Sequence, residues 1–192
     1  MNNSREILQN VIGQVRRVVL GKDVCIEKIM MAMLANGHVL MEDIPGVGKT
    51  TMAVAFARAL GLEARRMQFT SDVLPSDITG FSMYRKDLQN FVYQPGAVFC
   101  NLFLADEINR TSPKTQSALL EVMEERQVTV EGVTRQVPQP FMVIATQNPT
   151  GSAGTQMLPE SQMDRFLISL NMGYPELEDE ISILKGRSAG NP

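Results

Sequence analysis

The stretch that decides the fold is HVLMEDIPGVGKT, residues 38–50. Its first four residues are apolar and β-prone, which predicts a short strand. Gly46 and Gly48 follow in a turn, where glycine lets successive backbone N–H groups face one anion. Residues 50–60 are alanine-rich and predict a helix that ends at Gly61. Because this helix begins beside the glycines, its positive dipole end points at the same anion.

A strand, a glycine-rich loop, Lys-Thr and a helix form the pattern of a Walker A phosphate-binding loop. Lys49 can reach β- and γ-phosphate oxygens, and the hydroxyl of Thr50 can hold Mg²⁺. The expected nucleotide-binding residues are Gly46, Val47, Gly48, Lys49, Thr50 and Thr51. The first glycine of the usual pattern is Asp43 here, and Asp tolerates left-handed backbone, so the loop can still form. The alternative is a chance glycine-rich turn.

A second motif is the apolar run over 102–105, closed by Asp106 and Glu107. The run is typical of a strand buried on both faces. Asp106 is expected to bind Mg²⁺, directly or through water, and Glu107 to orient and polarise the attacking water. Two acids beside phosphates repel them unless a cation lies between, so Mg²⁺ is implied. The alternative is a strand end with two solvated acids, which the upstream motif disfavours.

A third candidate lies after another buried-type strand, over 141–145. Ligands of open α/β sheets bind beyond the carboxyl ends of the strands. Asn148, close behind this strand, can therefore hold the water or the γ-phosphate. Taken without the other motifs, Asn148 before Pro149 is a common turn pair.

Strands alternate with helices along the chain, which predicts an α/β fold with a mostly parallel sheet covered on both faces. The further expected elements are helices over 4–19 and 24–35, strands over 66–69 and 166–170, and a helix with Ser112 as N-cap and Pro113 in its first turn. Residues expected on buried helical faces include Ile7, Val11, Val15, Val18, Ile26, Ile29 and Leu34. Two stretches break the alternation: 71–99 holds short β-like pieces, and 127–138 reads as a hairpin.

Composition excludes several classes of protein. The length of 192 residues fits one compact domain, or one domain with a fragment of a second. A composition of 44% hydrophobic and 20% charged residues is typical of an ordinary soluble globular protein. A net charge of −3 argues against nucleic-acid binding by bulk charge. Apolar runs are shorter than the roughly 20 residues that span a bilayer, and residues 1–10 do not resemble a signal peptide, so we expect no membrane insertion and a cytoplasmic location. With His38 as the one histidine, no zinc spacing exists, and Cys25 and Cys100 are expected in the core.

Together these stretches resemble the MoxR family of AAA+ ATPases, in the clade with an insert in helix 2. The matching stretches are residues 38–43, 68–72, 74–80, 106–110, 114–121, 145–149 and 158–166. The likeness covers almost the whole chain, and Asp43 in place of glycine is also found in that family. Ser161 and Met163 depart from the alanine and leucine expected there, away from the proposed chemistry.

The resemblance implies a P-loop three-layer sandwich with a five-stranded parallel sheet, assembled into a ring-shaped hexamer when the lid is present. It makes Asn148 the sensor 1 residue. It makes Arg165 the arginine finger that reaches the γ-phosphate of the next subunit, where an arginine neutralises developing charge. The alternative for Arg165 is a salt bridge, with Asp164 as the expected partner. Arg110 is a second candidate for the contact between subunits.

The resemblance also divides the chain. It makes 1–174 the nucleotide-binding core, with 71–99 as the helix-2 insert and 127–138 as the hairpin before sensor 1. Such inserts often face a ring's pore or its client, and 19–21 correspond to the adenine pocket. Residues 175–192 would begin a helical lid that is otherwise missing. We expect such a chain to bind ATP weakly, turn over slowly and form hexamers poorly.

The function implied by the resemblance is ATP hydrolysis with Mg²⁺ by a chaperone-like remodeller or assembly factor for protein complexes. The family is linked to metal-cofactor insertion and to partners that carry von Willebrand factor A domains. One alternative is a nucleic-acid-stimulated AAA+ motor, which the lack of a basic stripe disfavours. Another is a nucleotide switch without hydrolysis, which the intact Walker residues disfavour.

Overall fold

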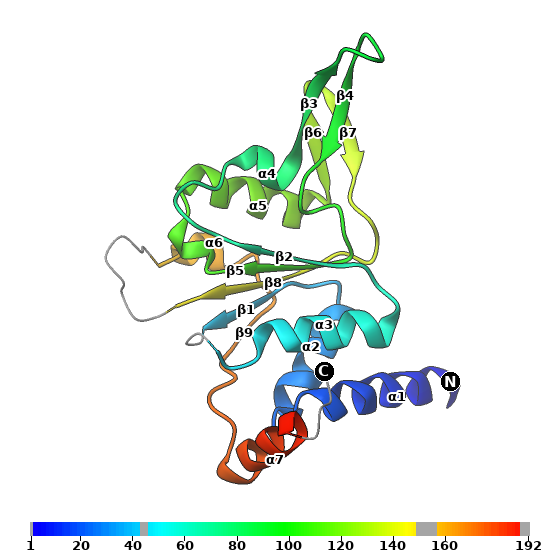
Figure 1. The fold of residues 1–192 in the computed structure, drawn as a ribbon, viewed down its shortest axis with the longest axis vertical. Coiled ribbons are helices and arrows are strands. Elements are labelled where there is room, and N and C mark those ends of the chain that lie inside the picture. Colours follow the sequence, from blue (N-terminus) through cyan, green and yellow to red (C-terminus); the bar gives the residue numbers. More distant parts are fainter. Residues whose placement is uncertain (1, 43–45, 149–156, 189–192) are drawn as a thin grey trace.

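A computed structural model describes residues 2–42, 46–148 and 157–188 (Figure 1). Its centre is a five-stranded sheet in the order β2-β5-β8-β1-β9, in which every neighbouring pair is parallel. The strands are β1 (Val39–Glu42), β2 (Ala64–Gln68), β5 (Leu102–Asp106), β8 (Met142–Gln147) and β9 (Ile168–Leu170). This arrangement confirms the predicted α/β class and the five-stranded parallel sheet.

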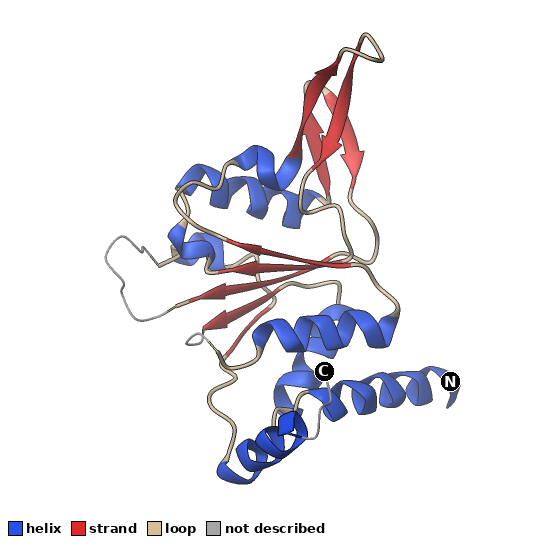
Figure 2. Ribbon diagram, in the orientation of Figure 1, coloured by secondary structure: helices blue, strands red, loops and turns tan. Residues whose placement is uncertain are grey.

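Helices cover both faces of this sheet (Figure 2). On one face lie α1 (Asn2–Val18), α2 (Asp23–Leu34) and α3 (Lys49–Leu60), and on the other lie α4 (Pro75–Thr79), α5 (Pro113–Glu125) and α6 (Glu160–Met163). A short 3-10 turn, η1 (Ile108–Arg110), follows β5, and α7 (Leu177–Ser188) follows β9. No helix in the described ranges is long and apolar enough to cross a membrane.

The core divides into two apolar layers, one on each face of the sheet. Along β5, Leu102 and Leu104 belong to the layer under α1–α3, while Phe103 and Ala105 belong to the layer under α5. This alternation follows from the period of two in a strand. All of β5 is buried, as its continuous apolar sequence predicts.

The predicted helix boundaries are confirmed by their caps. Gly61 ends α3 in the left-handed conformation, with φ 67°. Ser112 precedes α5, and its hydroxyl accepts a hydrogen bond from the backbone N–H of Thr115 at 3.3 Å. Pro113 occupies the first turn of that helix.

Some predicted core positions are wrong. Ile7 and Val18 of α1 are 54% and 57% exposed, and Leu34 of α2 is 59% exposed. In α1 the buried contacts come from Val11 and Val15. The predicted apolar stripe is wider than the surface that a neighbouring element covers. Residues at the margins of the stripe therefore stay in solvent.

The single histidine connects three segments inside the fold. His38 is buried, and its Nδ1 accepts the backbone N–H of Val143 at 2.9 Å. Nε2 therefore carries the proton and donates to the carbonyl of Met123 at 3.0 Å. Burial lowers the pKa of His38, and the nearby charge of Arg126 acts in the same direction.

Both cysteines lie in the core, as predicted. Cys25 and Cys100 are buried free thiols. Burial raises the pKa of Cys100 to about 12, so its reactive thiolate is scarce at neutral pH. A structural role for these residues agrees with their surroundings.

Two hairpins project from the α4–α5 face of the molecule (Figure 1). One is β3 (Gly80–Arg85) with β4 (Asn90–Pro95), and the other is β6 (Gln127–Val130) with β7 (Val133–Gln136). The Arg135 guanidinium lies 3.8 Å above the centre of the Tyr93 ring and joins the two. The predicted hairpin at 127–138 and the β-pieces of 71–99 are thereby confirmed, with α4 as an element that the sequence did not indicate.

Candidate functional site

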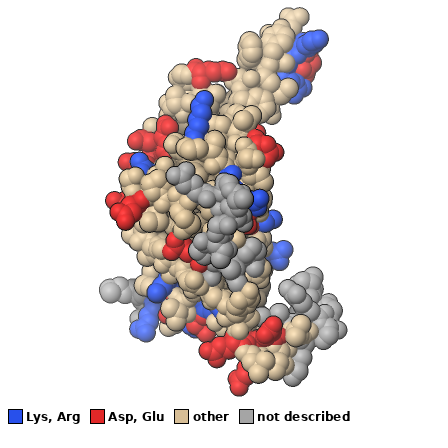
Figure 3. Space-filling view, turned by 90° about the vertical axis from the view of Figure 1, so that its left-hand side faces the viewer, with Lys and Arg blue, Asp and Glu red and all other residues tan. Residues whose placement is uncertain are grey.

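The three predicted motifs meet at one edge of the sheet. The glycine loop follows β1, Asn148 follows β8, and Asp106 ends β5. In the sheet β8 lies between β1 and β5, and all three strands are parallel. Their carboxyl ends therefore open on the same side, where the arrowheads point in Figure 1. Figure 3 looks onto this edge, over which acidic and basic side chains are both scattered.

Two glycines in the described part of the loop have left-handed backbone. Gly46 and Gly48 have φ values of 92° and 94°. A Cβ on either glycine would meet no atom of the described part of the chain within 4 Å, whereas the positive φ itself favours glycine. Gly48 is the N-cap of the 12-residue α3, whose first N–H groups point into the loop. Asp43 lies outside the described residues.

The side chains of this loop have different environments. Lys49, the first residue of α3, is only 7% exposed. Val47 is buried in the core beneath α3. Thr50 and Thr51 follow in the first turn and are exposed. Their hydroxyls are thus accessible at the end of the helix where an anion would bind.

The acids at the end of β5 are joined by one hydroxyl. Thr146 Oγ1 donates to Asp106 Oδ1 at 2.6 Å and accepts the backbone N–H of Glu107 at 2.8 Å. Thr146 is fully buried, so this relay is fixed by packing. Glu107 has φ 56° and ψ 50°, a left-handed conformation that turns the chain between the two carboxylates.

Each acid also forms an ion pair with an arginine of the same chain. Arg66 Nη2 lies 2.8 Å from Asp106 Oδ2, and Arg110 Nη1 lies 2.8 Å from Glu107 Oε2. Arg110 was a candidate for a contact with a second subunit, and here it binds its own chain. Sequence reasoning missed Arg66 and Thr146, because only the strand order brings β2 and β8 beside β5.

Asn148 lies beside the same group. The side-chain amide of Asn109, in η1, approaches the backbone carbonyl of Asn148 at 3.5 Å. Asn109 is buried, and its Oδ1 has no hydrogen-bond partner among the residues that the structure describes. The end of β8 is thus in contact with the turn that immediately follows Glu107.

Arg165 lies on the opposite face of the sheet from α3. Its Nε is 3.2 Å from Glu124 Oε2 on α5, and its Nη1 donates to the carbonyl of Ser161 at 2.9 Å. The salt bridge expected with Asp164 is therefore wrong, because neighbouring residues at a helix end point in different directions. Neither of these partners belongs to the group formed by Asp106, Glu107 and Thr146.

The donor set fits Mg²⁺. The hydroxyl of Thr50 and the carboxylate of Asp106 are hard oxygen donors, which this ion prefers. Both oxygens of Asp106 already accept hydrogen bonds, from Thr146 and Arg66. A Mg²⁺ ion would thus meet Asp106 through ordered water, or directly once Arg66 moves.

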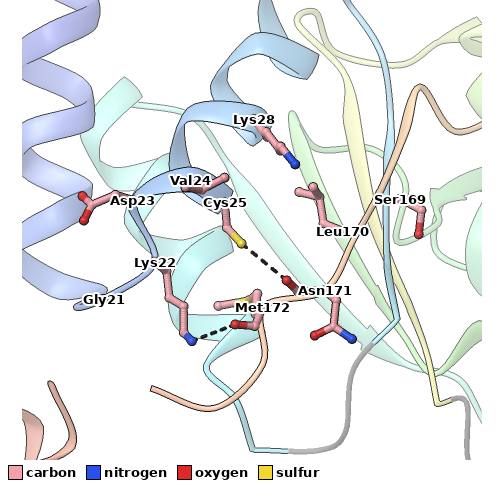
Figure 4. Close-up of a pocket in the computed structure, with 10 residues that line it drawn as sticks. All are labelled: Gly21, Lys22, Asp23, Val24, Cys25, Lys28, Ser169, Leu170, Asn171 and Met172. Atoms are coloured by element: carbon pink, nitrogen blue, oxygen red, sulfur yellow. Dashed lines mark hydrogen bonds between the residues drawn. The ribbon is translucent and has the colours of Figure 1, made fainter. Parts of the chain in front are cut away.

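A cavity of about 410 Å³ lies between the start of α2 and β9 (Figure 4). Its lining residues include Gly21, Lys22, Cys25, Lys28, Leu170, Asn171 and Met172. Lys22 Nζ donates to the carbonyls of Met172 and Tyr174 at 2.7 and 2.8 Å. Asn171 Nδ2 donates to the carbonyl of Glu42 at 3.1 Å, so the cavity adjoins the residue that leads into the glycine loop.

Comparison with known proteins agrees with this geometry. Residues 38–168 match the family described as "ATPase family associated with various cellular activities (AAA)", and the chain belongs to that family. The sheet order, the cradle at α3 and the paired acids on β5 are consistent with a nucleotide-binding domain of this class.

Within that class the chain is a member of the MoxR family. It is 47% identical to Chaperone MoxR1 of Mycobacterium tuberculosis over 92% of this chain and 47% of that protein. It is 52% identical to the uncharacterized protein YeaC of Bacillus subtilis over 97% of this chain and 58% of that protein. A crystal structure from Cytophaga hutchinsonii, of a protein proposed to be an ATPase, matches with a TM-score of 0.89 and 41% identity, over 97% of this chain and 57% of that one. The chain thus spans about half the length of these proteins.

Proposed function

We propose that this chain is the nucleotide-binding core of a Mg²⁺-dependent MoxR-type ATPase. One observation carries the proposal: the glycine loop, the acids of β5 and Asn148 follow three adjacent parallel strands. Thr146 binds Asp106 and the backbone of Glu107, and Asn109, in the turn after Glu107, contacts the backbone carbonyl of Asn148. Such an arrangement has the parts that phosphoryl transfer to water requires.

The roles of the residues follow from their positions. The N–H groups of the loop and the ammonium of Lys49 would bind the phosphates. Thr50 and Asp106 would hold Mg²⁺, which when bound neutralises charge on the phosphoryl oxygens. Glu107 would orient and polarise the attacking water, and Asn148 would hold the γ-phosphate or that water. The ion pair between Arg110 and Glu107 Oε2 would orient this carboxylate, which can still accept a hydrogen bond from water.

A neighbouring subunit would complete the site. The Arg165 side chain is 38% exposed and pairs with a glutamate that is itself 61% exposed, so this weak surface pair can exchange partners. We assign Arg165 the role of an arginine finger that acts on the nucleotide of the next subunit in a hexameric ring. Arg110 is the second candidate, although its bond to Glu107 favours a role within its own chain.

The remaining parts of the chain are assigned in the same way. Residues 1–174 would form the core and 175–192 the beginning of a lid. The cavity at Gly21 would receive the adenine end of ATP, because Asn171 joins it to the approach of the loop. The exposed apolar side chains of the two hairpins support contacts with client proteins.

We assign this ATPase a role in the cytoplasm, where it would remodel protein complexes. This role includes the insertion of metal cofactors into those complexes. Proteins with von Willebrand factor A domains would be its partners. The name of Chaperone MoxR1 supports the chaperone-like part of this role. Charges of both signs on the edge seen in Figure 3 give no support to a nucleic-acid motor.

The decisive test is Glu107→Gln in the full-length protein. Turnover should fall by about 10²–10³-fold, the size expected when a water-orienting group is lost, while ATP still binds. Phosphate release and the fluorescence of a labelled ATP analogue measure the two quantities. Glu6→Gln, an exposed change on α1, is the matched control. Hydrolysis at the normal rate by Glu107→Gln, or none by the unmodified protein, would refute the proposal.

A further inference from the structure

A second polar group spans three strands behind the phosphate loop. Glu42 is the last residue of β1. Its Oε1 accepts a hydrogen bond from Gln147 Nε2 at 2.5 Å, and its Oε2 accepts one from Ser169 Oγ at 3.0 Å. The backbone carbonyl of Glu42 accepts Asn171 Nδ2 at 3.1 Å. One residue thus joins the ends of β8, β1 and β9.

The side chain of Glu42 lies on the sheet face away from α3. Leu40, two residues earlier, belongs to the apolar layer under α5, whereas Met41 belongs to the layer under α3. Gln147 shares the α5 side with Ala145, which is in the same layer as Leu40. The Glu42 carboxylate therefore faces away from the phosphate cradle, and a role as a phosphate or metal ligand does not fit it.

The partner of Glu42 is unusual in its burial. Gln147 is fully buried, and its Oε1 has no hydrogen-bond partner within the described ranges. An unpaired buried carbonyl destabilises the fold, so an apolar side chain would suit this position better for stability alone. The hydrogen bond from the Gln147 side chain to Glu42 is therefore the feature that needs an explanation.

The sequence positions of the pair supply that explanation. In the sheet Glu42 lies opposite Gln147. The phosphate loop begins directly after Glu42, and Asn148 directly follows Gln147. A short bond to a carboxylate is stronger than one between neutral groups. The bond thus fixes the end of β8 to the start of the loop.

We propose that Glu42 and Gln147 are positioning residues that set the place of Asn148 relative to the bound γ-phosphate. This inference rests on the proposed role of Asn148 in hydrolysis. Neither residue would touch the nucleotide. A displacement of about 1 Å in a reacting group can slow a reaction on the order of 100-fold. Loss of the hydrogen bond between Glu42 and Gln147 should therefore reduce turnover, while the affinity of the phosphate loop for the nucleotide should stay unchanged.

Glu42→Ala in the full-length protein removes the bond. Its kcat should fall about ten- to hundredfold, while the Kd for a fluorescent ATP analogue changes by less than about threefold. Glu42→Gln should keep kcat within about threefold of normal, because its amide oxygen still accepts Gln147 Nε2. A role of Glu42 in stability alone would change the melting temperature without this split between kcat and Kd.

Gln147→Met tests the same bond from the other strand, and also serves if Glu42→Ala fails to fold. It should lower kcat as Glu42→Ala does, and the double variant should be no slower than the slower single variant. Thr134→Ala is the control for a lost hydrogen bond away from the site, since it removes the exposed hydroxyl pair with Thr129 on the β6–β7 hairpin. Its kcat should stay within about threefold of normal.

Several outcomes would overturn the inference. These are a normal kcat in Glu42→Ala or Gln147→Met, effects that multiply in the double variant, or a loss of ATP affinity equal to the loss of kcat. Asn148→Ala distinguishes a failure of the positioning role of Glu42 from a failure of the proposed function. If it abolishes turnover while Glu42→Ala does not, only the positioning role fails. If the unmodified protein does not hydrolyse ATP, the proposed function fails instead.

Discussion

The strand-end site and the pair of hairpins are built in opposite ways. At the site, Thr146 is fully buried and holds both Asp106 and the backbone of Glu107. On the β3–β4 hairpin, Tyr84 and Phe91 are 51% and 65% exposed. The first region places polar groups inside packed structure, and the second places apolar groups in solvent. The comparison shows that packing fixes the positions of the polar groups at the site, whereas the hairpins leave apolar side chains exposed for contacts.

The exposure of the hairpin has a simple geometric origin. In β3, Phe81 and Met83 lie on one face, and Tyr84 lies on the other with Phe91 of β4. Tyr84 and Phe91 contact each other edge to face, with ring centres 5.4 Å apart. A two-stranded ribbon has no second layer to bury both faces. Its apolar side chains therefore remain available for contacts outside the chain.

The largest effect is expected from Phe103→Ala, beneath the site. Phe103 is fully buried in β5, three residues before Asp106, and packs edge to face against Phe69. Truncation should lower the free energy of unfolding by about 3–5 kcal/mol, because it leaves a cavity. Urea denaturation measures this change. A loss as small as that of an exposed phenylalanine would contradict the packed character of this region.

Lys49→Ala should be next in size and should act on ligand affinity. Removal of a charged donor from the cradle should weaken ATP binding about ten- to hundredfold, with little change in the melting temperature of the free protein. Isothermal titration calorimetry gives the Kd. Lys86→Ala, an exposed lysine in the turn of the β3–β4 hairpin, is the control for simple loss of charge. Equal losses of affinity in both variants would argue against a specific cradle.

Stability should also depend on pH through His38. Burial lowers the pKa of His38 in the folded state. Above about pH 6.5 the imidazole is therefore neutral in both the folded and the unfolded chain, and the protein has its full stability. Below this pH the unfolded chain binds a proton that the folded chain resists, so stability falls by at most about 1.4 kcal/mol per pH unit. Melting temperatures between pH 7.5 and 5.5 test this, and the slope should shrink in His38→Gln. An unchanged slope in that variant would assign the effect to other groups.

The smallest effect is expected from Phe91→Ala, the counterpart of Phe103→Ala. Phe91 is largely exposed, so its loss should change the free energy of unfolding by no more than about 0.5 kcal/mol. The same urea denaturation compares the two variants directly. A large loss would mean that the hairpin is part of the packed core after all.

Most of the fold was predictable because its signals are local. The glycine loop, the apolar run before Asp106 and the cap at Ser112 each depend on a few neighbouring residues, and the structure confirms all three. The errors at Ile7 and Leu34 arose where periodicity alone could not show how wide a contact surface is. The neighbouring element decides which residues at the edge of an apolar stripe are buried. A local sequence pattern does not contain that information.

The supporting residues of the site were much harder to predict. Arg66 and Asp106 are 40 residues apart, and Glu42 and Gln147 are 105 apart. These pairs follow from the strand order and from the side of the sheet on which each residue lies. Arg165 shows the same limit, because its partner proved to be Glu124 of α5 and not its neighbour in sequence.

The contact of Arg135 with Tyr93 has a mechanical consequence. Tyr93 also donates a hydrogen bond to the carbonyl of Thr79, at the end of α4. The two hairpins are therefore coupled to each other and to the helix at their base. A small rotation of α4 would swing both ribbons together as one stiff arm, and the free tips would travel farther than the base.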